Sequence, residues 1–319
     1  SRTGTRVHSD SSTGVLLNVE EIAAVLNKYP DVCSVVDTVS SFSTVPTPVD
    51  ALGIDVMLTG SQKALALPPG LAIFACSDRA FARAEHQKDR GYYFDFLEFK
   101  KNHEKDMTPS TPCISLIYGL RAKLREIEAE GIQNRYKRHA KLNAKVHAWV
   151  EKHGYDFFAP EGYRSKALTC VANNKDTDIP NLIKLLRENH SLIIDGGYGK
   201  VKGKTFRISN MGDETEKTMD SVLNALDGVA AGEERAMPEH LWQALEATSV
   251  LVASTSAASS SPGLGSVNSL RSVSSADSNS TISLHDDGGL DAAGGGGGSL
   301  RHVSPLLALT PALCGCIGS

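Results

Sequence analysis

Lys63 stands in the run Leu58-Thr59-Gly60-Ser61-Gln62-Lys63-Ala64, and Asp37 closes an earlier apolar run, Val32–Asp37. Short apolar runs bounded by turn residues are typical of buried strands, so both groups are expected at or just beyond a strand end. Pyridoxal phosphate needs this pair of groups, because a lysine holds it as a Schiff base and an acidic partner keeps its ring nitrogen protonated. The spacing of Asp37 and Lys63 therefore predicts a site for this cofactor.

Such a site has three further requirements, and the sequence offers a candidate residue for the first and the last of them. A lysine must lose its proton to form an imine, so Lys63 should be partly desolvated. A phosphate is bound by backbone N–H groups and hydroxyls at a turn or a helix N-terminus. The α-carboxylate of a substrate matches the planar fork of an arginine, and Arg207 is the candidate.

The segment that carries Asp37 and Lys63 alternates helix and strand signals. Asn18 with Glu21 three residues later predicts a capping box that opens a helix. Two more short apolar runs, 55–59 and 71–76, predict strands. Short strands alternating with amphipathic helices predict an α/β layer around a largely parallel sheet.

A different pattern begins near residue 107. The Thr/Pro-rich segment 108–112 predicts an extended connector, because a residue before proline is pushed out of the α region. Apolar residues at i+3 and i+4 spacing then predict a long helix that stops at Gly131, and a second helix to about His153. The remaining signals predict strands at 168–172, near 192–194 and at 206–209, with helices at about 179–189 and 214–230.

The chain changes character again after residue 231. Residues 251–300 contain 14 Ser and 9 Gly. This composition buries too little apolar area to offset roughly 1–2 kcal/mol of backbone entropy per residue. We predict a low-complexity, largely disordered tail over 232–319, in which Cys314 and Cys316 are incidental thiols and the apolar run 306–309 is incidental too.

The composition excludes several classes of function. A formal net charge of -4 at pH 7 gives no basic surface for nucleic acid. No apolar run reaches the roughly 18–20 residues that span a membrane. The scattered cysteines favour reduced thiols in an intracellular, soluble protein. No targeting signal is apparent, so the cytoplasm is the default compartment, with peroxisome and mitochondrion left open.

Six short motifs follow one another along the chain: His8–Val15, Val36–Ser41, Gly53–Asp55, Thr59–Ala64, Pro68–Leu71 and Phe206–Gly212. In residue type and spacing they resemble the class V (fold type I) aminotransferases that depend on pyridoxal 5'-phosphate, close to the alanine–glyoxylate and serine–glyoxylate branch. The resemblance covers roughly residues 6–230. It implies that 1–106 is the C-terminal part of the large cofactor-binding domain and 107–231 the small C-terminal α+β domain.

The resemblance also implies a role for individual residues. Lys63 would form the Schiff base and carry the proton at the substrate Cα, and Arg207 would bind the substrate carboxylate. The cofactor would be held by Asp37 at its ring nitrogen, Val39 against a ring face, Ser11 near the ring hydroxyl, Gln62 at the phosphate, and Ser110 or Thr111 at the phosphate in the partner subunit.

Most of these assignments have a simpler alternative. Asp37 could be a turn or cap residue, and Arg207 could belong to a surface ion pair. Ser11, Gln62 and Ser110 could make only local turn hydrogen bonds.

Three further features stay outside the cofactor assignments. We read His8 as structural, and we read the Gly196–Gly199 turn as a flexible edge near the substrate entrance. Asp10 stands where family members often have Glu, so a contact from this shorter side chain is left open.

The resemblance implies transamination from a small amino acid, alanine or serine, to a 2-oxo acid such as glyoxylate or pyruvate. Another class V reaction, such as a lyase, is an alternative. A desulfurase is disfavoured, because loop 195–205 holds no cysteine and Cys170 lies in a predicted strand. A non-catalytic interaction scaffold is the alternative from another class.

Family members are generally homodimers, so we expect a homodimer. We expect no metal site. The chain starts at Ser1, and strand-like sequence is under way by Val7. This predicts a fragment with a natural start further upstream. Nothing before His8 supplies the phosphate-binding turn or the aromatic that stacks on the cofactor ring, so we expect residues 1–319 alone to bind the cofactor weakly or fold poorly.

Overall fold

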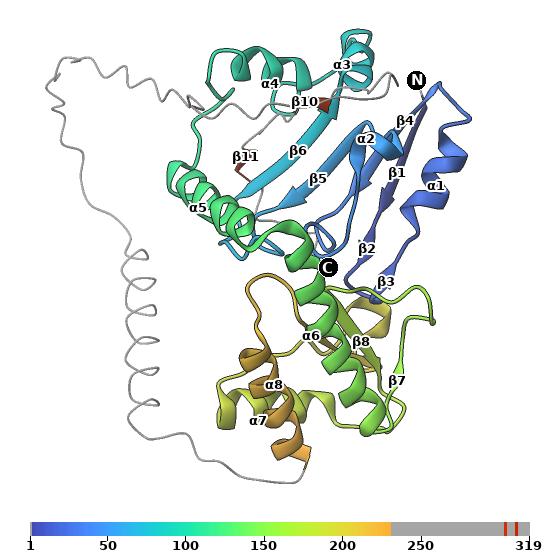
Figure 1. Ribbon diagram of the computed structural model, residues 1–319, viewed down its shortest axis with the longest axis vertical. Helices are drawn as coiled ribbons and strands as arrows, with labels where there is room; N and C mark the ends of the chain where they lie inside the picture. The colour runs from blue at the N-terminus through green and yellow to red at the C-terminus, as the bar shows by residue number, and fades with distance from the viewer. Residues whose placement is uncertain (1, 231–302, 305–309, 312–319) are drawn as a thin grey trace, which may run out of the picture.

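The computed structural model describes residues 2–230, 303–304 and 310–311. Figure 1 shows two parts: a sheet flanked by helices near the N-terminus, and a smaller α/β unit below it, joined by a long helix. The tail predicted for 232–319, including Cys314, Cys316 and 306–309, lies outside the described residues except for two short strands. The predicted boundaries between the domains remain predictions.

The larger sheet has parallel and antiparallel strands. β1 (Arg2–Val7), β4 (Val32–Asp37) and β5 (Val56–Gly60) are parallel neighbours. β6 (Leu71–Ser77) runs antiparallel to β5, and β10 (Val303–Ser304) and β11 (Thr310–Pro311) pair antiparallel with β6. Because β1, β4 and β5 point the same way, the segments that follow them meet at one edge of the sheet.

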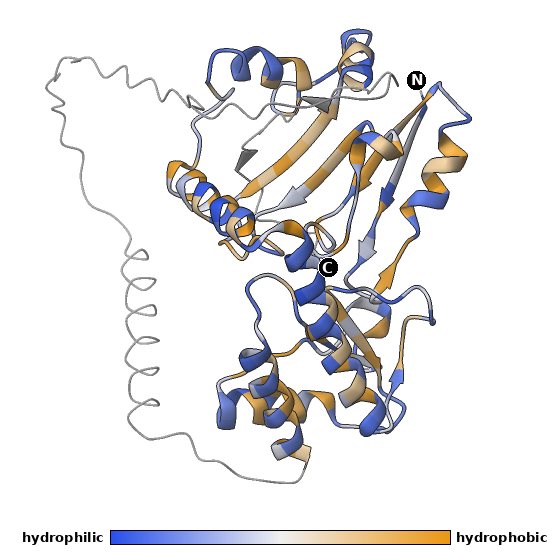
Figure 2. Ribbon diagram, viewed as in Figure 1, coloured by the Kyte–Doolittle hydropathy of each residue, from blue (hydrophilic) through white to orange (hydrophobic). Residues whose placement is uncertain are grey.

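Helices cover both faces of this sheet because successive strand residues point to opposite sides. Val36 packs in one cluster with buried residues of α1 (Val19–Leu26) and of the turn after α2 (Val49–Leu52). Val35 faces a second cluster, built with α3 (Asp78–Glu85) and α4 (Phe96–His103). The predicted α/β layer is confirmed, and the orange strands of Figure 2 show how apolar these strands are.

Local signals explain where several helices start and stop. The Asn18 side chain accepts a hydrogen bond from the Glu21 N–H, as the predicted cap requires. α5 (Ile114–Glu130) gives way to α6 (Ile132–Lys152) at Gly131, which has φ of 79°. A left-handed φ of this kind suits glycine, and the predicted break is confirmed.

The smaller unit packs three helices against a second sheet. β7 (Asp156–Phe157), β8 (Leu168–Ala172) and β9 (Thr205–Ser209) form this antiparallel sheet. α6, α7 (Ile179–His190) and α8 (Glu216–Ala230) contribute to one continuous core. Its fully buried members include Leu142, Val146, Leu186, Phe206 and Met219.

The strand predicted near 192–194 is wrong. The chain leaves α7 through Ser191 in a left-handed conformation, and Ile193 is 71% exposed. Only the next residue pairs with the sheet, through an isolated bridge between Asp195 and Arg207. A short apolar run does not by itself distinguish a strand from an irregular segment that buries one side chain.

No helix in the described part of the chain has the length and hydropathy to cross a bilayer.

Candidate active site

Three of the predicted site residues meet at the edge where the parallel strands end. Asp37 is the last residue of β4, and Lys63 comes three residues after the end of β5. Ser11 directly follows β2 (Ser9–Asp10), which begins two residues after the end of β1. The carboxyl edge of a parallel sheet is where α/β proteins commonly bind ligands. Topology alone therefore explains why residues far apart in sequence converge.

Lys63 is held by a tight turn after β5. The buried Ser61 hydroxyl donates to the Pro68 carbonyl at 2.8 Å and accepts from the Leu71 N–H at 3.2 Å. The Lys63 carbonyl accepts from the Ala66 N–H at 2.9 Å. These bonds fix the backbone of the turn, while the Lys63 side chain is half-buried.

A cavity of about 520 Å³ opens beside this turn. Lys63, Gln62 and Ser11 line it together with Arg207, so the predicted amine and the predicted carboxylate-binding group share one space. The other lining residues come mainly from the smaller unit: Leu168, Leu186, Leu192, Ile193, Ile194, Asp195, Ile208, Ser209, Met211, Glu214 and Val222.

Asp37 and Val39 lie at the same sheet edge but not in the cavity lining. The Asp37 Oδ1 atom accepts the Val39 N–H at 2.8 Å, so the carboxylate has the local turn bond given by the simpler alternative. Both residues are half-buried. The geometry places Asp37 on the strand next to the one that leads into the Lys63 turn.

Arg207 is already engaged within the chain. Its Nε donates to Asp195 Oδ1 at 2.9 Å, and its Nη2 lies 2.5 Å from Asp195 Oδ2. Its Nη1 donates to the Ser11 carbonyl at 2.5 Å. The ion pair that sequence analysis gave as the alternative reading of Arg207 is therefore present, and it lies inside the cavity.

The hairpin of β2 and β3 (Val15–Leu16) joins this cavity to the smaller unit. Gly14 has φ of 72°, and a Cβ built there would lie 2.9 Å from the Cys170 Cβ atom. The Gly14 carbonyl accepts from the Ser165 N–H at 2.8 Å. This close approach holds Ser11 next to Arg207 on β9.

Asp10 stabilises the turn of the hairpin. Its carboxylate accepts hydrogen bonds from the Ser12 and Thr13 hydroxyls at 2.6–2.9 Å. Burial alone would raise the pKa of Asp10, but the hydrogen bonds from Thr13 and Ser12 and the charge of Arg207 outweigh it and lower the pKa. The short side chain at this position therefore has a local role.

His8 is not among the residues that line the cavity, and its contacts fit the structural reading. Its ring is buried, and Nδ1 lies 3.0 Å from the Ser41 Oγ atom. Burial lowers its pKa, against a smaller opposing effect from Glu20.

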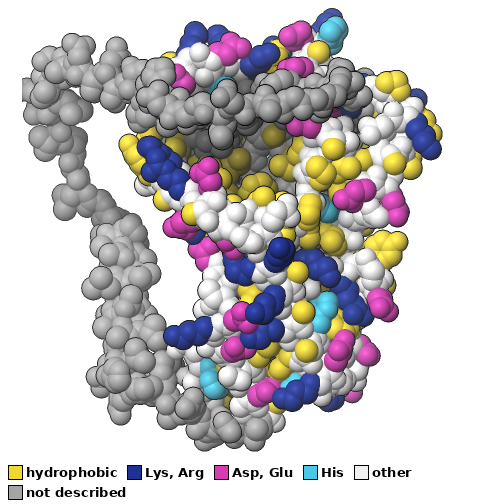
Figure 3. Space-filling model, in the orientation of Figure 1, with side chains coloured by type: hydrophobic (Ala, Val, Ile, Leu, Met, Phe, Trp, Pro, Cys, Tyr) yellow, Lys and Arg dark blue, Asp and Glu magenta, His cyan; other side chains and the backbone are white. Residues whose placement is uncertain are grey.

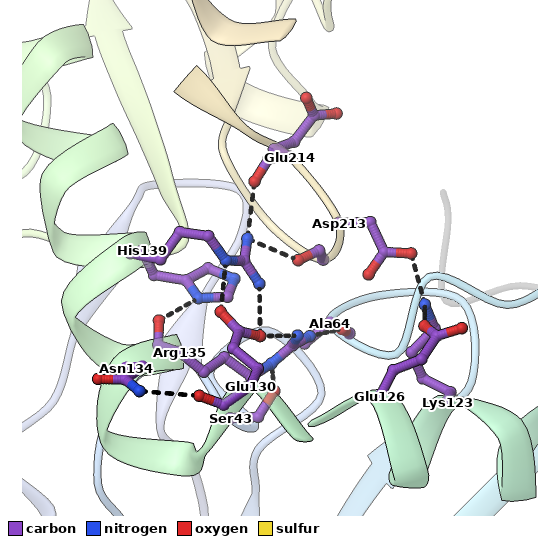
Figure 4. Close-up of polar contacts among 12 residues, drawn as sticks. Ser43, Ala64, Lys123, Glu126, Glu130, Asn134, Arg135, His139, Asp213 and Glu214 are labelled. Atoms are coloured by element: carbon purple, nitrogen blue, oxygen red, sulfur yellow. Dashed lines mark hydrogen bonds and ion pairs between the residues drawn. The ribbon is translucent and has the colours of Figure 1, made fainter. Parts of the chain in front are cut away.

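The junction of α5 and α6 holds the Lys63 turn against the smaller unit (Figure 4). Arg135 is buried, and its Nη2 donates to the Ala64 carbonyl at 2.6 Å while its Nε donates to Ser43 at 3.0 Å. Ala64 directly follows Lys63. The buried guanidinium therefore positions the backbone next to the predicted catalytic amine.

A second arginine extends this junction to the loop after β9. Arg138 donates to the Glu214 carbonyl at 2.7 Å and to the Gly212 carbonyl at 3.2 Å. Glu130 bridges the two arginines, at 3.1 Å from Arg135 Nη1 and 2.6 Å from Arg138 Nε. Its pKa is lowered mainly by the hydrogen bond from Arg138, which outweighs the effect of burial. The junction thus connects the Lys63 turn to the segment that follows Arg207. On the surface, Figure 3 shows Lys and Arg side chains gathered over this part of α6.

Ser110 and Thr111 are not brought to the cavity of their own chain. Both are exposed and lie just before α5, and the Ser110 carbonyl accepts from the Thr108 hydroxyl at 2.7 Å. Their predicted contact with the phosphate in a partner subunit stays a prediction.

Sequence reasoning missed Asp195 and the Glu130–Arg135–Arg138 junction. Asp195 had a usable signal, since it closes the apolar run 192–194 just as Asp37 closes its own run. The junction had none, because a buried arginine on a helix reads like any other basic residue.

The donor set fits pyridoxal phosphate in its chemistry. An amine, a hydroxyl and an amide, from Lys63, Ser11 and Gln62, surround one cavity, and the Asp37 carboxylate stands at the adjacent strand end. These are groups that can hold an aldehyde, ring substituents and a ring nitrogen.

Comparison with known proteins gives one consistent result. The family model "Aminotransferase class-V" matches residues 5–221. An uncharacterized aminotransferase of Methanocaldococcus jannaschii is 37% identical over 225 residues, which cover 70% of this chain and 58% of that protein. A serine–glyoxylate aminotransferase of Arabidopsis thaliana is 34% identical over 226 residues, covering 70% and 56%.

The solved structures agree. The crystal structure of an alanine–glyoxylate aminotransferase from Nostoc sp. superimposes with a TM-score of 0.68 at 29% sequence identity, covering 72% of this chain and 61% of that one. The chain thus spans less than two thirds of the length of these relatives.

Proposed function

The chain belongs to the class V aminotransferase family, and from that premise we propose that it serves a pyridoxal-phosphate-dependent transamination. The proposed donor is a small amino acid, alanine or serine, and the proposed acceptor is a 2-oxo acid such as glyoxylate or pyruvate. The names of relatives that act on serine, alanine or aspartate together with glyoxylate support this substrate class. The structural observation that carries the proposal is the single cavity lined by both Lys63 and Arg207.

Each of the chain's own groups has a distinct task in this reaction. The bound cofactor supplies an electron sink that makes the proton at the substrate Cα removable. Lys63 Nζ is the amine that holds the cofactor and then accepts and returns that proton. The Asp37 carboxylate keeps the ring nitrogen protonated, and Val39 packs against the ring.

The remaining residues orient the two ligands. Ser11 and Gln62 contact the ring hydroxyl and the phosphate. Arg207 binds the substrate α-carboxylate, because its planar donors match a carboxylate bidentately. In a homodimer, Ser110 or Thr111 would reach the phosphate of the partner subunit.

A trapping experiment tests the assignment of Lys63. Because weak binding is expected, the chain is incubated with excess pyridoxal phosphate, reduced with borohydride to trap the bound cofactor, and digested for mass spectrometry. We expect the cofactor mass on the Lys63 peptide of the parent chain and its loss in Lys63→Arg. Lys141→Arg, at an exposed ion-paired lysine of α6, is the matched control and should keep the label.

Labelling of Lys63 no stronger than labelling of exposed lysines would contradict the proposal and favour the scaffold alternative. Where Lys63 is labelled, transfer of the amino group from L-serine or L-alanine to glyoxylate is measured next. The expected weak binding of the cofactor predicts a low rate, and this transfer should be kept in Lys141→Arg and lost in Lys63→Arg.

A further inference from the structure

We propose that Asp195 is a specificity residue that competes with the substrate carboxylate for Arg207. The inference rests on the proposed role of Arg207 and concerns how that role is limited. Asp195 acts as a built-in carboxylate ligand, which an incoming α-carboxylate has to displace or share.

The contacts between Asp195 and Arg207 are those of a bidentate carboxylate pair. The Nε···Oδ1 and Nη2···Oδ2 distances are 2.9 and 2.5 Å, so one whole edge of the guanidinium is occupied. The Ser11 carbonyl takes Nη1 on the other side. A substrate carboxylate therefore meets an arginine whose best donor edge is filled and whose charge is already neutralised.

The backbone holds Asp195 in this position. The Arg207 N–H donates to the Asp195 carbonyl at 2.8 Å, and this bridge sets the two residues opposite each other. The Asp195 Oδ1 atom also accepts the Gly197 N–H at 2.9 Å, which fixes the carboxylate on its own turn. The pair is thus set by the fold and not by the chance meeting of two long side chains.

Exposure differs between the two partners. The Arg207 side chain is 17% exposed, whereas the Asp195 side chain is 49% exposed. Water can solvate the more exposed carboxylate more readily than the guanidinium, so Asp195 is the partner that a ligand displaces, at the cost of its bonds to Arg207 and the Gly197 N–H. A second carboxylate, Glu214, also lines the cavity. Two carboxylates disfavour an additional negative charge on the substrate side chain, which points to amino acids with neutral side chains.

The test measures carboxylate binding at Arg207 without using turnover. Arg207 in the full chain is modified with phenylglyoxal, and peptide mass spectrometry follows the rate of this modification. Propanoate, a non-reacting carboxylate, is then titrated to measure how well it protects Arg207 from modification. In Asp195→Asn we expect faster modification and half-protection at a propanoate concentration roughly tenfold lower, the size of one charged hydrogen bond.

Three variants make the outcome unambiguous. Glu216→Gln removes a carboxylate of similar exposure from another ion pair of the smaller unit, and it should leave rate and protection unchanged. Asp195→Ala should reproduce the gain if Asp195→Asn disturbs the fold, and circular dichroism shows which variants are folded. Arg207→Lys removes the modified group and identifies the peptide.

Unchanged or weaker protection in both Asp195 variants would overturn the proposal, because Asp195 would then only position Arg207. The assay needs neither cofactor nor turnover, so its failure is distinct from failure of Lys63 labelling. Labelling without a gain in carboxylate affinity contradicts the competition alone. A gain in affinity without labelling contradicts the transaminase assignment alone.

Discussion

The two parts of the molecule position their functional groups in different ways. Lys63 and Ser11 lie on turns and Asp37 ends a strand at the edge of the larger sheet, where the buried residues divide among three separate clusters. Arg207 lies on a strand of the smaller unit, which has one continuous core. The arginine backbone is therefore positioned by its own unit, and its side chain adds one hydrogen bond to the Ser11 carbonyl of the larger part. The backbone of the lysine turn itself depends on a contact from outside, the Arg135 hydrogen bond to the Ala64 carbonyl.

This difference indicates which substitutions should displace each group. A core defect in the smaller unit displaces Arg207 directly. The Lys63 turn is sensitive instead to changes at the junction of α5 and α6, a place that touches no ligand. Three substitutions examine this contrast.

The largest effect is expected for Phe206→Ala. Phe206 is fully buried and packs edge-on to Tyr155, with ring centroids 5.3 Å apart. Its loss should lower the free energy of unfolding by about 3–5 kcal/mol through a cavity in the continuous core. Hydrogen exchange should show reduced protection throughout the smaller unit, with β4 and β5 little changed.

Phe81→Ala is the matched control, since Phe81 is equally apolar and 3% exposed but belongs to a smaller cluster. Its effect should be centred on β4, β5, β6, α3 and α4, with the smaller unit little changed. Equal loss of protection in both parts for either variant would mean that the molecule unfolds as one unit, and the contrast would fail.

The next effect concerns the junction. Glu130→Gln leaves the buried Arg135 without its carboxylate, and we expect a loss of about 3 kcal/mol in unfolding free energy. Protection should fall on both sides of the junction, at the Lys63 turn and at the loop after β9. Urea unfolding and hydrogen exchange measure both quantities.

Glu98→Gln breaks the exposed pair with Lys101 and should change the unfolding free energy by less than about 0.5 kcal/mol. If Glu130→Gln were as mild, the junction would not be what holds the lysine turn in place.

The smallest effect is a pH dependence carried mainly by α6. Burial lowers the pKa of His139 and of His147 to about 4 in the folded chain, below the ordinary value of about 6.5. The unfolded chain then binds more protons between these values. The contribution of each histidine to the free energy of unfolding is therefore fully present above pH 6.5. It is lost as the pH drops toward 4, by up to about 1.4 kcal/mol per pH unit for each histidine.

His147→Phe should remove one of these contributions, because a phenyl ring fits beside Phe157 and needs no proton. The difference in unfolding free energy between pH 6.5 and 5.5 should shrink by about 1 kcal/mol. In the larger part burial also lowers the pKa of His8, so the smaller unit, with both His139 and His147, should lose more stability in acid. His103→Gln, at an exposed histidine, is the control and should leave the pH dependence unchanged. An equally unchanged dependence in His147→Phe would contradict the contribution assigned to His147.

Much of the fold followed from local patterns. The strand ending at Asp37 and the helix break at Gly131 were predictable, because hydrophobic period and glycine conformation are local properties. α3 and α4 were not predicted, and the strand near 192–194 was predicted wrongly. Whether a short apolar run becomes a strand depends on a neighbour being available to pair with it, which is a tertiary property.

The residues of the site were predictable, but the contacts between them were not. Ser11, Gln62, Lys63 and Arg207 were singled out from motifs, and the structure gathers them around one cavity. The pairing of Arg207 with Asp195 depends on the register between β9 and the segment after α7. No sequence spacing encodes that register.

The conformation of Gly14 has a consequence for which positions near this site tolerate substitution. Because glycine has no side chain, the hairpin packs directly against Cys170, and this close approach keeps Ser11 beside Arg207. A larger residue at 14 would be strained by the left-handed φ whatever the space, and its Cβ would also lie 3.1 Å from the Cys170 backbone nitrogen. Opening space on β8 would therefore not by itself permit a side chain at 14, and attempts to retune the cavity should leave this glycine in place.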